Sequence, residues 1–440
     1  MRTPYPYQVE GIKALVQNSQ FILADDMGLG KTYQLIRAAL QLRPSYVLIV
    51  CPAVVRGVWA KELRAEGVTD ITVIQKGGDI PRSKALKGWI VVSYDLFRQA
   101  TTAKWGRPDI MIADEAHKIK SIDKPTNAKV SAIAAMAGRF WPATGTPVKN
   151  HYGEFFALAR LVIPFEVLQQ HGVETFLKWR NKFCIVVTET IYVRGGKQRQ
   201  ITRIAGSKNP KELGDLIKPY MLRRKKERVL LDLPALRWQP LTVNLVGYIE
   251  YTEKQLDALI WAAENGTTPS FDKDGEHIAT LRSRIASAKV PATAQIAIDH
   301  CESTQEPLVI FCCYLDAIHA LAAALREKKL RVEVIVGGVG DDQRTAIVEN
   351  FQKGEVDVFI GQIRAAGVGI TLTRAWRSLF MDLDFAPTEN AQARDRLHRI
   401  GQEQVVLSQY LVSEHPVDAQ VNEIIAKKTA AISLLEEAVT

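Results

Sequence analysis

The sequence has little that would suit an oxidising compartment or a membrane. Its five cysteines are an odd number and lack C-x-x-C spacing, so they indicate neither a disulfide framework nor a zinc site. No apolar run of about 18 residues is present, and the first residues lack the apolar core of a secretion signal. We therefore expect an intracellular protein of the cytoplasm or nucleoid, or of the nucleus in a eukaryote.

Acidic residues are also in deficit. The chain has 48 Asp and Glu against 57 Lys and Arg, which gives a net charge of +9. This balance favours a polyanion such as nucleic acid as a partner, although a basic protein without such a partner would have the same composition. Its 440 residues suffice for two or three domains that each bury a core.

What the sequence does have is a strand-turn-helix pattern near its start. An apolar run at 21–24 precedes D-D-M-G-L-G-K-T at 25–32, and a helix-like segment follows at 33–42. Glycines let backbone N–H groups approach a polyphosphate, to which a lysine adds a charge, while a threonine hydroxyl suits Mg²⁺. The expected nucleotide-binding residues are Asp26, Met27, Gly28, Leu29, Gly30, Lys31 and Thr32. Asp25 stands where the full pattern has glycine, so a glycine-rich turn without function is the alternative.

Gln8 lies upstream of this loop, after Tyr5-Pro6-Tyr7. A glutamine amide can donate to and accept from the edge of adenine at once. Taken alone, Gln8 would be a surface residue at a helix start. With a nucleotide loop downstream, adenine recognition is the better interpretation.

Continuous apolar runs at 46–52, 89–94 and 109–113 predict buried parallel strands covered by helices on both faces. The third run ends at Asp114-Glu115-Ala116-His117. Ligands bind at the carboxyl ends of such strands, so these carboxylates should meet the phosphates held by Lys31. We expect Asp114 to hold Mg²⁺ largely through water and Glu115 to orient and deprotonate the attacking water. A surface acidic pair is the alternative.

A further polar segment, T-G-T-P at 144–147, follows another apolar run. The hydroxyls of Thr144 and Thr146 could relay the state of the γ-phosphate to the rest of the molecule. An ordinary turn is an equally good interpretation.

Together these motifs resemble, in order and spacing, the first motor lobe of superfamily 2 helicases. The loop is similar to the D-E-M-G-L-G-K-T of the SWI/SNF-type branch, with Asp26 in place of Glu at a position from which no chemistry is expected. Residues 222–234 match that branch's L-R-R-x-K-x-x-V-x-x-x-L-P signature, which the resemblance makes the link between lobes. Without the resemblance, 223–228 would be a solvated charge run or a localisation tag.

The second half repeats the alternation. Strand-like runs at 308–312, 331–336, 356–360, 378–381 and 405–411 alternate with helix-like segments at 316–328, 342–353 and 388–400. Residues 364–372 resemble the family's R-A-G-G-x-G-x-x-L, with Ala366 replacing a glycine and with Gly367 and Gly369 retained as nucleotide-site residues. Phe385-Ala386-Pro387 replaces the family's W-N-P, which puts a stacking role there in doubt.

Residues 392–402 match the family's Q-A-x-D-R-x-H-R-I-G-Q. Gln392, Arg396 and Arg399 are spaced i, i+4, i+7, which predicts one helical face. The resemblance implies that this face presents two guanidiniums to the γ-phosphate, where a planar fork suits phosphoryl charge. Without the resemblance, three polar residues on a helix are usually solvated.

The fold class expected is α/β, with two RecA-like parallel-sheet lobes and helical protrusions. We expect lobe 1 at 1–150, its protrusion at 151–221, a linker at 222–245, the protrusion of lobe 2 at 246–288, lobe 2 at 289–415 and a C-terminal helix at 416–440. A basic stretch at 194–203 is a candidate loop over DNA, with a surface hairpin as the alternative, and 267–276 reads as a loop. Family resemblance makes the strand-end positions candidates for DNA-backbone contacts: Pro52, Ala53, Ser93, Tyr94, Cys312 and Thr371.

The resemblance implies an ATP- and Mg²⁺-dependent translocase on double-stranded DNA that remodels or displaces bound protein, or anneals strands, without separating them. The second lobe is most similar to the annealing-helicase kind, and we expect a monomer. One alternative is a strand-separating DNA or RNA helicase. Another, from a different class, is a nucleotide-gated DNA clamp or scaffold with negligible hydrolysis.

Overall fold

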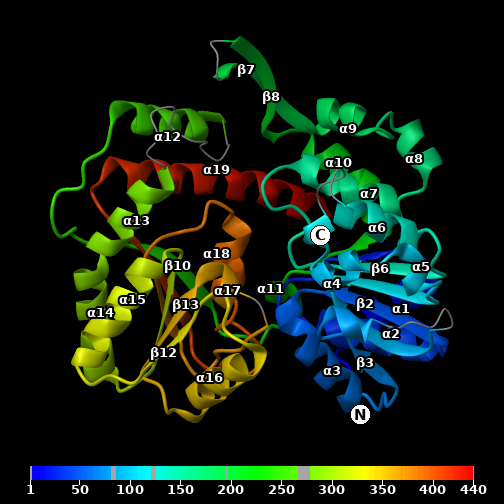
Figure 1. Ribbon diagram of the computed structural model, residues 1–440, viewed down its shortest axis with the longest axis horizontal. Coiled ribbons are helices and arrows are strands. Elements are labelled where there is room, and N and C mark those ends of the chain that lie inside the picture. The colour runs from blue at the N-terminus through cyan, green and yellow to red at the C-terminus, as the bar shows by residue number, and fades with distance from the viewer. Residues whose placement is uncertain are drawn as a thin grey trace. The chain divides into compact units, whose positions relative to one another are not determined.

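The computed structural model describes residues 2–80, 86–119, 125–193, 197–265, 278–367 and 369–439. The chain divides into two compact units (Figure 1). Unit 1 comprises Met1–Leu231 and Ala430–Thr440, and unit 2 comprises Asp232–Thr429. The long C-terminal helix α19 (Pro416–Val439) therefore contributes residues to both units.

Unit 1 is built on a parallel sheet of seven described strands in the order β3-β4-β2-β5-β6-β1-β9. The strands are β1 (Ile22–Leu23), β2 (Tyr46–Cys51), β3 (Ile71–Val73), β4 (Gly88–Ser93), β5 (Ile110–Asp114), β6 (Arg139–Ala143) and β9 (Met221–Leu222). The predicted strands at 46–52, 89–94 and 109–113 correspond to β2, β4 and β5. All six residues of β2 are buried, as expected of a strand covered on both faces.

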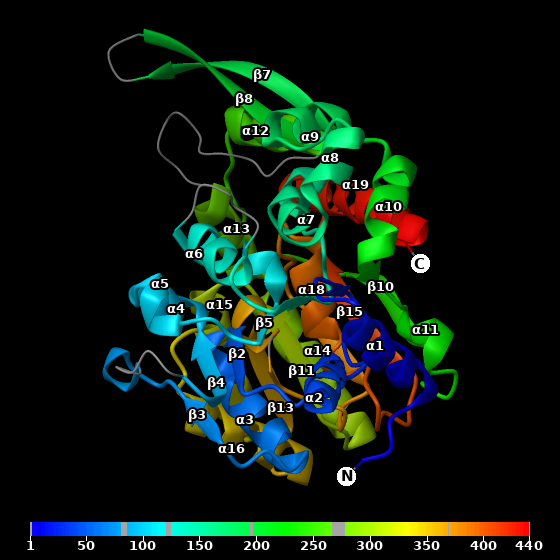
Figure 2. The same cartoon turned by 90° about the vertical axis from the view of Figure 1, so that its right-hand side faces the viewer.

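Helices lie on both faces of this sheet (Figure 2). Alternate residues of β2 (Tyr46, Leu48 and Val50) face a core that also includes residues of α4 (Tyr94–Gln99), α6 (Pro125–Ala134) and α7 (Phe156–Val162). The other face is covered by α2 (Lys31–Leu42) and α3 (Arg56–Ala65), and α1 (Pro6–Gln17) packs on α2.

The region predicted as a helical protrusion, 151–221, also contains an antiparallel hairpin. Along the chain, α8 (Phe165–Gln170) and α9 (Phe176–Phe183) precede the paired strands β7 (Cys184–Val193) and β8 (Lys197–Ser207). Helix α10 (Pro210–Ile217) follows them. Figure 1 shows the hairpin extending away from these helices. The basic stretch 194–203 falls largely on β8, and its residues 194–196 lie outside the described residues.

Unit 2 contains a second parallel sheet, in the order β10-β15-β14-β11-β13-β12. Its described strands are β10 (Leu236–Thr242), β11 (Leu308–Cys312), β12 (Val332–Ile335), β13 (Val358–Gln362), β14 (Arg377–Phe380) and β15 (Val406–Val412). All but β10 correspond to the strand-like runs of the second half of the sequence; β10 lies in the segment predicted as a linker. The expected α/β class with two parallel sheets is confirmed.

Two cores flank this second sheet. One joins it to α14 (Val290–Thr304) and α15 (Leu315–Glu327), and the other joins it to α16 (Asp341–Lys353), α17 (Ile363–Ala366) and α18 (Pro387–Arg394). A smaller core packs α12 (Glu253–Asn265) and α13 (Ile278–Ala288) against the start of α19. The loop expected at 267–276 lies outside the described residues.

The segment predicted as a linker, 222–245, begins and ends in sheets. Strand β9 pairs with β1 in unit 1, whereas β10 pairs with β15 along seven residues in unit 2. Between them lies the short helix α11 (Lys226–Val229). Across the described residues, no helix is long and apolar enough to cross a membrane.

Candidate active site

The phosphate loop, residues 25–32, connects β1 to α2. Gly28 and Gly30 have φ angles of +87° and +72°, in the left-handed region that glycine enters without strain. Gly30 is the N-cap of α2, so the N–H groups of the helix's first turn begin at Lys31 and Thr32. The sequence thus builds the strand, turn and helix N-terminus that an anionic phosphate needs.

Gln8 anchors this loop from α1. Its amide oxygen accepts from Tyr5 N at 3.1 Å, and its Nε2 donates to Leu29 O at 3.2 Å. A Cβ added at Gly30 would lie 2.5 Å from Gln8 Nε2, so only glycine fits there. The side chain of Leu29 is buried, which leaves only its backbone for a nucleotide contact. Adenine recognition by Gln8 stays a prediction.

Lys31 points back into the loop that carries it. Its Nζ donates to the carbonyl oxygens of Asp25 at 2.8 Å and Asp26 at 3.2 Å. Burial lowers the pKa of Lys31, against the attraction of nearby carboxylates, first that of Glu115. A Cβ at Gly145 of the T-G-T-P segment would lie 3.3 Å from Nζ, so that segment packs directly on the loop.

Asp114 ends β5 and is held on three sides. Trp59 Nε1 donates to its Oδ2 at 2.8 Å, Glu115 N donates to its Oδ1 at 3.0 Å, and Tyr94 OH donates to its carbonyl at 2.8 Å. Burial, together with the Glu115 charge, raises the pKa of Asp114. Trp59 fixes this carboxylate and Tyr94 fixes the backbone of Asp114, roles that their sequence positions gave no sign of.

Glu115 has a φ of +50°, an uncommon backbone conformation for a residue other than glycine. Its Oε2 lies 3.2 Å from His117 Nδ1, which is also 3.3 Å from Thr144 Oγ1 and 3.5 Å from Thr146 Oγ1. Burial would raise the pKa of Glu115, but His117 and the Lys31 charge together lower it. His117 therefore joins the carboxylate to both threonines, and the D-E-A-H spelling was the signal for it.

Two arginines of the L-R-R-x-K signature hold the carboxylates of the loop. Arg224 donates to Asp25 through Nε at 2.9 Å and Nη2 at 2.5 Å, and Asp25 also accepts from Gln34 Nε2 at 3.0 Å. Arg223 Nη2 donates to Asp26 Oδ1 at 3.1 Å. Both arginines are buried, as is Asp25. They are neither a solvated charge run nor merely a link, because they brace the loop itself.

In unit 2, the predicted helical face is not formed. Helix α18 ends at Arg394, so Gln392 is helical, whereas Arg396 and Arg399 lie in the turn of residues 395–401, here called the arginine turn. The carbonyl of Arg396 accepts from Leu372 N at 2.9 Å, and Gly401 has a φ of +96°. The prediction of one helix through 400 was wrong: the helix ends at Arg394, and the Arg396 carbonyl bonds to Leu372 of the glycine loop.

The arginine turn contacts the glycine loop of residues 364–372. Arg396 donates to Gln392 O at 3.1 Å and Ile370 O at 3.4 Å, while Arg399 donates to Asp395 O at 2.9 Å and Thr371 Oγ1 at 3.4 Å. Gly369 has a φ of +75°. A Cβ at Gly367 would lie 2.7 Å from Ile363 O, so both glycines are required by the backbone.

The doubt about stacking at Phe385 is resolved within the chain. The guanidinium of Arg282 lies 4.4 Å from the centre of the Phe385 ring, and Lys428 Nζ donates to its carbonyl at 3.2 Å. Phe385 therefore takes part in a cation–π contact within unit 2.

The candidate DNA-contact residues differ in exposure. Cys312, Ser93, Tyr94 and Pro52 are buried, Thr371 is half-buried and Ala53 is exposed. Ser93 accepts from Leu96 N and caps α4. Contact by the buried residues would have to come through their backbone.

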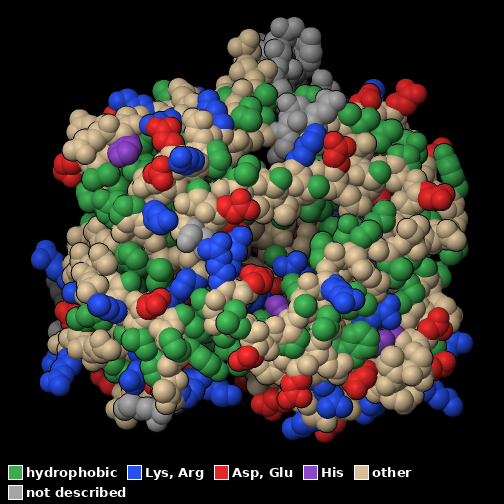
Figure 3. Space-filling model, turned by 180° about the vertical axis from the view of Figure 1, so that it is seen from behind, with side chains coloured by type: hydrophobic (Ala, Val, Ile, Leu, Met, Phe, Trp, Pro, Cys, Tyr) green, Lys and Arg blue, Asp and Glu red, His purple; other side chains and the backbone are tan. Residues whose placement is uncertain are grey.

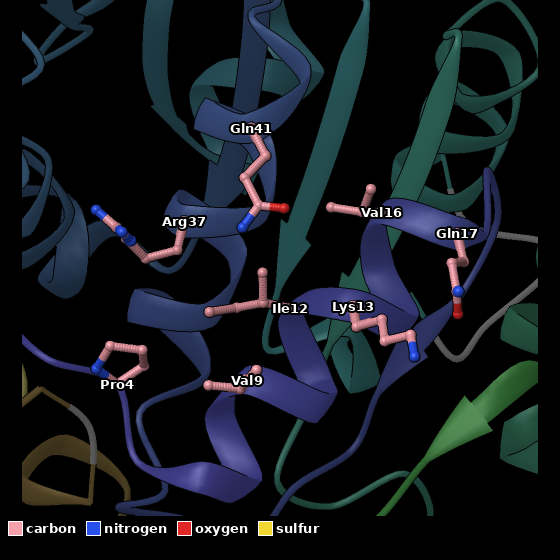
Figure 4. Close-up of a pocket in the computed structure, with 8 residues that line it drawn as sticks. All are labelled: Pro4, Val9, Ile12, Lys13, Val16, Gln17, Arg37 and Gln41. Carbon is pink, nitrogen blue, oxygen red and sulfur yellow. The ribbon is translucent and has the colours of Figure 1, made fainter.

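A cavity of about 430 Å³ opens between α1 and α2 (Figure 4). None of its lining residues is among the predicted nucleotide contacts. It is lined by Pro4, Val9, Ile12, Lys13, Val16, Gln17, Arg37 and Gln41.

The described residues include no group of three or more His, Cys, Asp or Glu placed to bind a metal ion. A magnesium ion shared by one carboxylate, one hydroxyl, phosphates and water needs no such group. The buried Lys31 cation beside the N-terminus of α2 fits a polyphosphate, and Asp114 and Thr32 are the residues that would hold the ion.

Comparison with known proteins identifies the family. A model described as SNF2-related domain matches residues 7–268, more than half of the chain. The chain belongs to the SNF2-related family. A second model, described as helicase conserved C-terminal domain, matches residues 288–401. This range includes the glycine loop, Arg396 and Arg399. The resemblance inferred from the motifs is confirmed.

Two relatives illustrate where this SNF2-related chain stands. It is 29% identical to a Caenorhabditis elegans SWI/SNF-related matrix-associated actin-dependent regulator of chromatin subfamily A-like protein 1 homolog, over 94% of this chain and 59% of that protein. It is 28% identical to the Bos taurus DNA annealing helicase and endonuclease ZRANB3, over 94% of this chain and 38% of that protein. The chain thus spans less than two thirds of each.

Among solved structures, the Sulfolobus solfataricus SWI2/SNF2 ATPase core in complex with dsDNA is similar over 94% of this chain and 88% of that one. Identity is 23% and the TM-score is 0.46, which is too distant to say anything of DNA binding by this chain.

Proposed function

We propose that this SNF2-related chain is an ATPase that uses Mg²⁺-ATP to move along double-stranded DNA without separating its strands. The observation that carries the proposal is the convergence in unit 1 of three separate motifs. Lys31 lies against Gly145, and His117 joins Glu115 to Thr144 and Thr146. A phosphate-binding lysine, an acidic pair and a coupling segment thus meet at one end of the sheet.

The roles follow from these positions. Lys31 binds the β- and γ-phosphates, while Asp114 and Thr32 hold Mg²⁺ largely through water. Bound Mg²⁺ neutralises phosphate charge. Glu115 orients the attacking water and accepts its proton, and its lowered pKa keeps it in the ionised form that a base requires.

Unit 2 supplies the remaining groups in this proposal. Arg396 and Arg399, with Gln392, act on the γ-phosphate during hydrolysis, as guanidiniums suit developing phosphoryl charge. The Arg399 contact with Thr371 supports a link to DNA, because Thr371 is a candidate backbone contact. Thr144 and Thr146 pass the nucleotide state onward.

The proposed partner is duplex DNA, bound by its backbone without sequence preference. The net charge of +9 supports this, as does the annealing-helicase name of one relative. On the face in Figure 3, Lys and Arg occur in small groups among Asp and Glu rather than as one basic surface. Displacement of a DNA-bound protein, or strand annealing, is the proposed outcome.

The test is the steady-state ATPase rate without nucleic acid and with duplex DNA, single-stranded DNA or RNA, at one stated salt concentration. Stimulation by duplex alone supports the proposal. Stimulation chiefly by single strands or RNA would replace it with a strand-separating helicase. Tight duplex binding with no turnover under any condition would indicate a nucleotide-gated clamp.

A further inference from the structure

The last turns of α19 have a fitted seat in unit 1. Leu435 and Val439 belong to the main core of that unit, and Tyr152 OH donates to Ala431 O at 2.7 Å. Gly214 leaves room for the helix, since a Cβ there would lie 2.6 Å from Ala438 Cβ. The helix begins in unit 2, where Val417, Val421 and Ile424 belong to a core with residues of α12 and α13.

One polar contact in this seat reaches the phosphate loop. Glu436 accepts a hydrogen bond from Arg223 Nη2, which also donates to Asp26. Arg223 Nη1 donates to Ala24 O at 2.8 Å and to Gly145 O at 3.2 Å. A single buried guanidinium therefore holds α19, the loop and the T-G-T-P segment together.

Asp26 lies between this guanidinium and Lys31. Its carboxylate accepts from Arg223 and from Lys226 N, and its carbonyl accepts from Lys31 Nζ at 3.2 Å. A shift of Arg223 would thus move the residue that positions the phosphate-binding lysine. Burial raises the pKa of Glu436, while Arg223 lowers it, so the ion pair is what favours its charged form.

We propose that Glu436 is a positioning residue for the nucleotide loop, acting through Arg223, so that docking of the last turns of α19 and nucleotide binding favour each other. This proposal rests on ATP binding at the phosphate loop. It assigns a regulatory role to a helix end that contributes no group to the chemistry. Coupling of this kind must be reciprocal: nucleotide should also hold the helix end in its seat.

The test compares Glu436→Gln with Glu437→Gln in the full chain. Glu437 is the next residue of the same helix and is exposed, so its substitution makes the same charge change away from Arg223. We expect Glu436→Gln to raise the Kd for Mg²⁺-ADP and the KM for ATP about fivefold. The kcat should change less than twofold, and Glu437→Gln should match the wild type. An unchanged Kd in Glu436→Gln would overturn the proposal.

A conservative variant and a second readout separate positioning from general loss of structure. Glu436→Asp keeps the charge on a shorter arm and should give a Kd between those of wild type and Glu436→Gln. In wild type, Mg²⁺-ADP should slow amide hydrogen exchange across residues 430–439, and in Glu436→Gln it should do so less. If Mg²⁺-ADP leaves amide hydrogen exchange in this segment of the wild type unchanged, the coupling is contradicted. A wild type that binds no nucleotide would instead refute the proposed function.

Discussion

The two units each hold a pair of arginines in a fixed place, but by different bonds. In unit 1, Arg223 and Arg224 donate to the carboxylates of Asp26 and Asp25. In unit 2, hydrogen bonds to the carbonyls of Gln392 and Asp395 orient Arg396 and Arg399. Arg223 and Arg224 thus form ion pairs within unit 1.

This difference separates the arginines that stabilise the structure of the loop from the arginines proposed to act on the nucleotide. Removing the carboxylate from a buried ion pair leaves an uncompensated charge and lowers the free energy of unfolding by about 3–5 kcal/mol. We therefore expect substitutions around Arg223 and Arg224 to act first on stability. Substitutions of Arg396 and Arg399 should act first on turnover.

The largest effect is expected from Arg399→Ala. It should lower kcat by about 10³- to 10⁵-fold, the range for arginines that stabilise phosphoryl transfer, with a smaller change in nucleotide affinity. Single-turnover hydrolysis and Kd measurements would show the split. Arg374→Ala, which removes an exposed arginine from the neighbouring loop, is the matched control. A defect confined to nucleotide affinity would show that Arg399 supports binding and does not act on the rate of hydrolysis.

Glu115→Gln comes next. Loss of the base should lower kcat by about 10²- to 10⁴-fold. Nucleotide should still bind, because Lys31 and the N-terminus of α2 are intact. Equilibrium binding of a labelled nucleotide and phosphate release, measured on the same sample, check both statements. Unchanged turnover would remove Glu115 from the base role.

The motif that carries Glu115 could be recognised in the sequence because it is local. One apolar run predicts β5 and the carboxylates that follow it. Another predicts β1, and the glycine turn and the start of α2 follow it directly. Local patterns also predicted β11 with the bounds Leu308–Cys312. A buried parallel strand needs only its own residues to be apolar, so the sequence suffices there.

The supporting contacts were not predictable in this way. Arg224 and Asp25 are 199 residues apart in sequence, so only folding brings the charge run and the loop together. The helical spacing of 392–399 was misleading because α18 ends at Arg394, and the backbone beyond it bonds to Leu372, which lies outside this segment. Strands β7 and β8 pair as an antiparallel hairpin, as the alternative interpretation of 194–203 expected, and the signal is Gly195-Gly196 between two runs with β-branched residues.

Ala366 shows how a family departure is accommodated. Its methyl group is buried in a core of unit 2. Gly361 of β13 faces it, and a Cβ at Gly361 would lie 2.6 Å from that methyl group. The glycine missing from the loop is thus matched by a glycine in the adjacent strand, a relation that the sequence pattern alone does not reveal.

Asp25→Asn tests the support side directly. It removes the buried carboxylate partner of Arg224 and leaves the exposed Glu10 carboxylate, 3.6 Å from Nη1, so it should lower the free energy of unfolding of unit 1 by about 3 kcal/mol. Urea titration followed by fluorescence would measure this. The double variant Asp25→Asn, Arg224→Met should lose less than the two single variants combined. Additive losses would mean that the pair is not coupled, and the contrast between the units would fail.

The smallest effect concerns acid, and it should fall on unit 2. His300 is a buried residue of α14 whose ring packs edge-on against Trp376, and burial, then the nearby Arg377 charge, lowers its pKa to about 4. A histidine has a pKa of about 6.5 when unfolded, so the unfolded chain binds the proton first and stability falls as pH drops from about 6.5 to 4. The loss should approach about 3 kcal/mol at the lower end of that window. His300→Gln should flatten this dependence, whereas His319→Gln, an exposed histidine of α15, should leave it unchanged. Equal pH dependence in the wild type and His300→Gln would show that the acid sensitivity of unit 2 arises elsewhere.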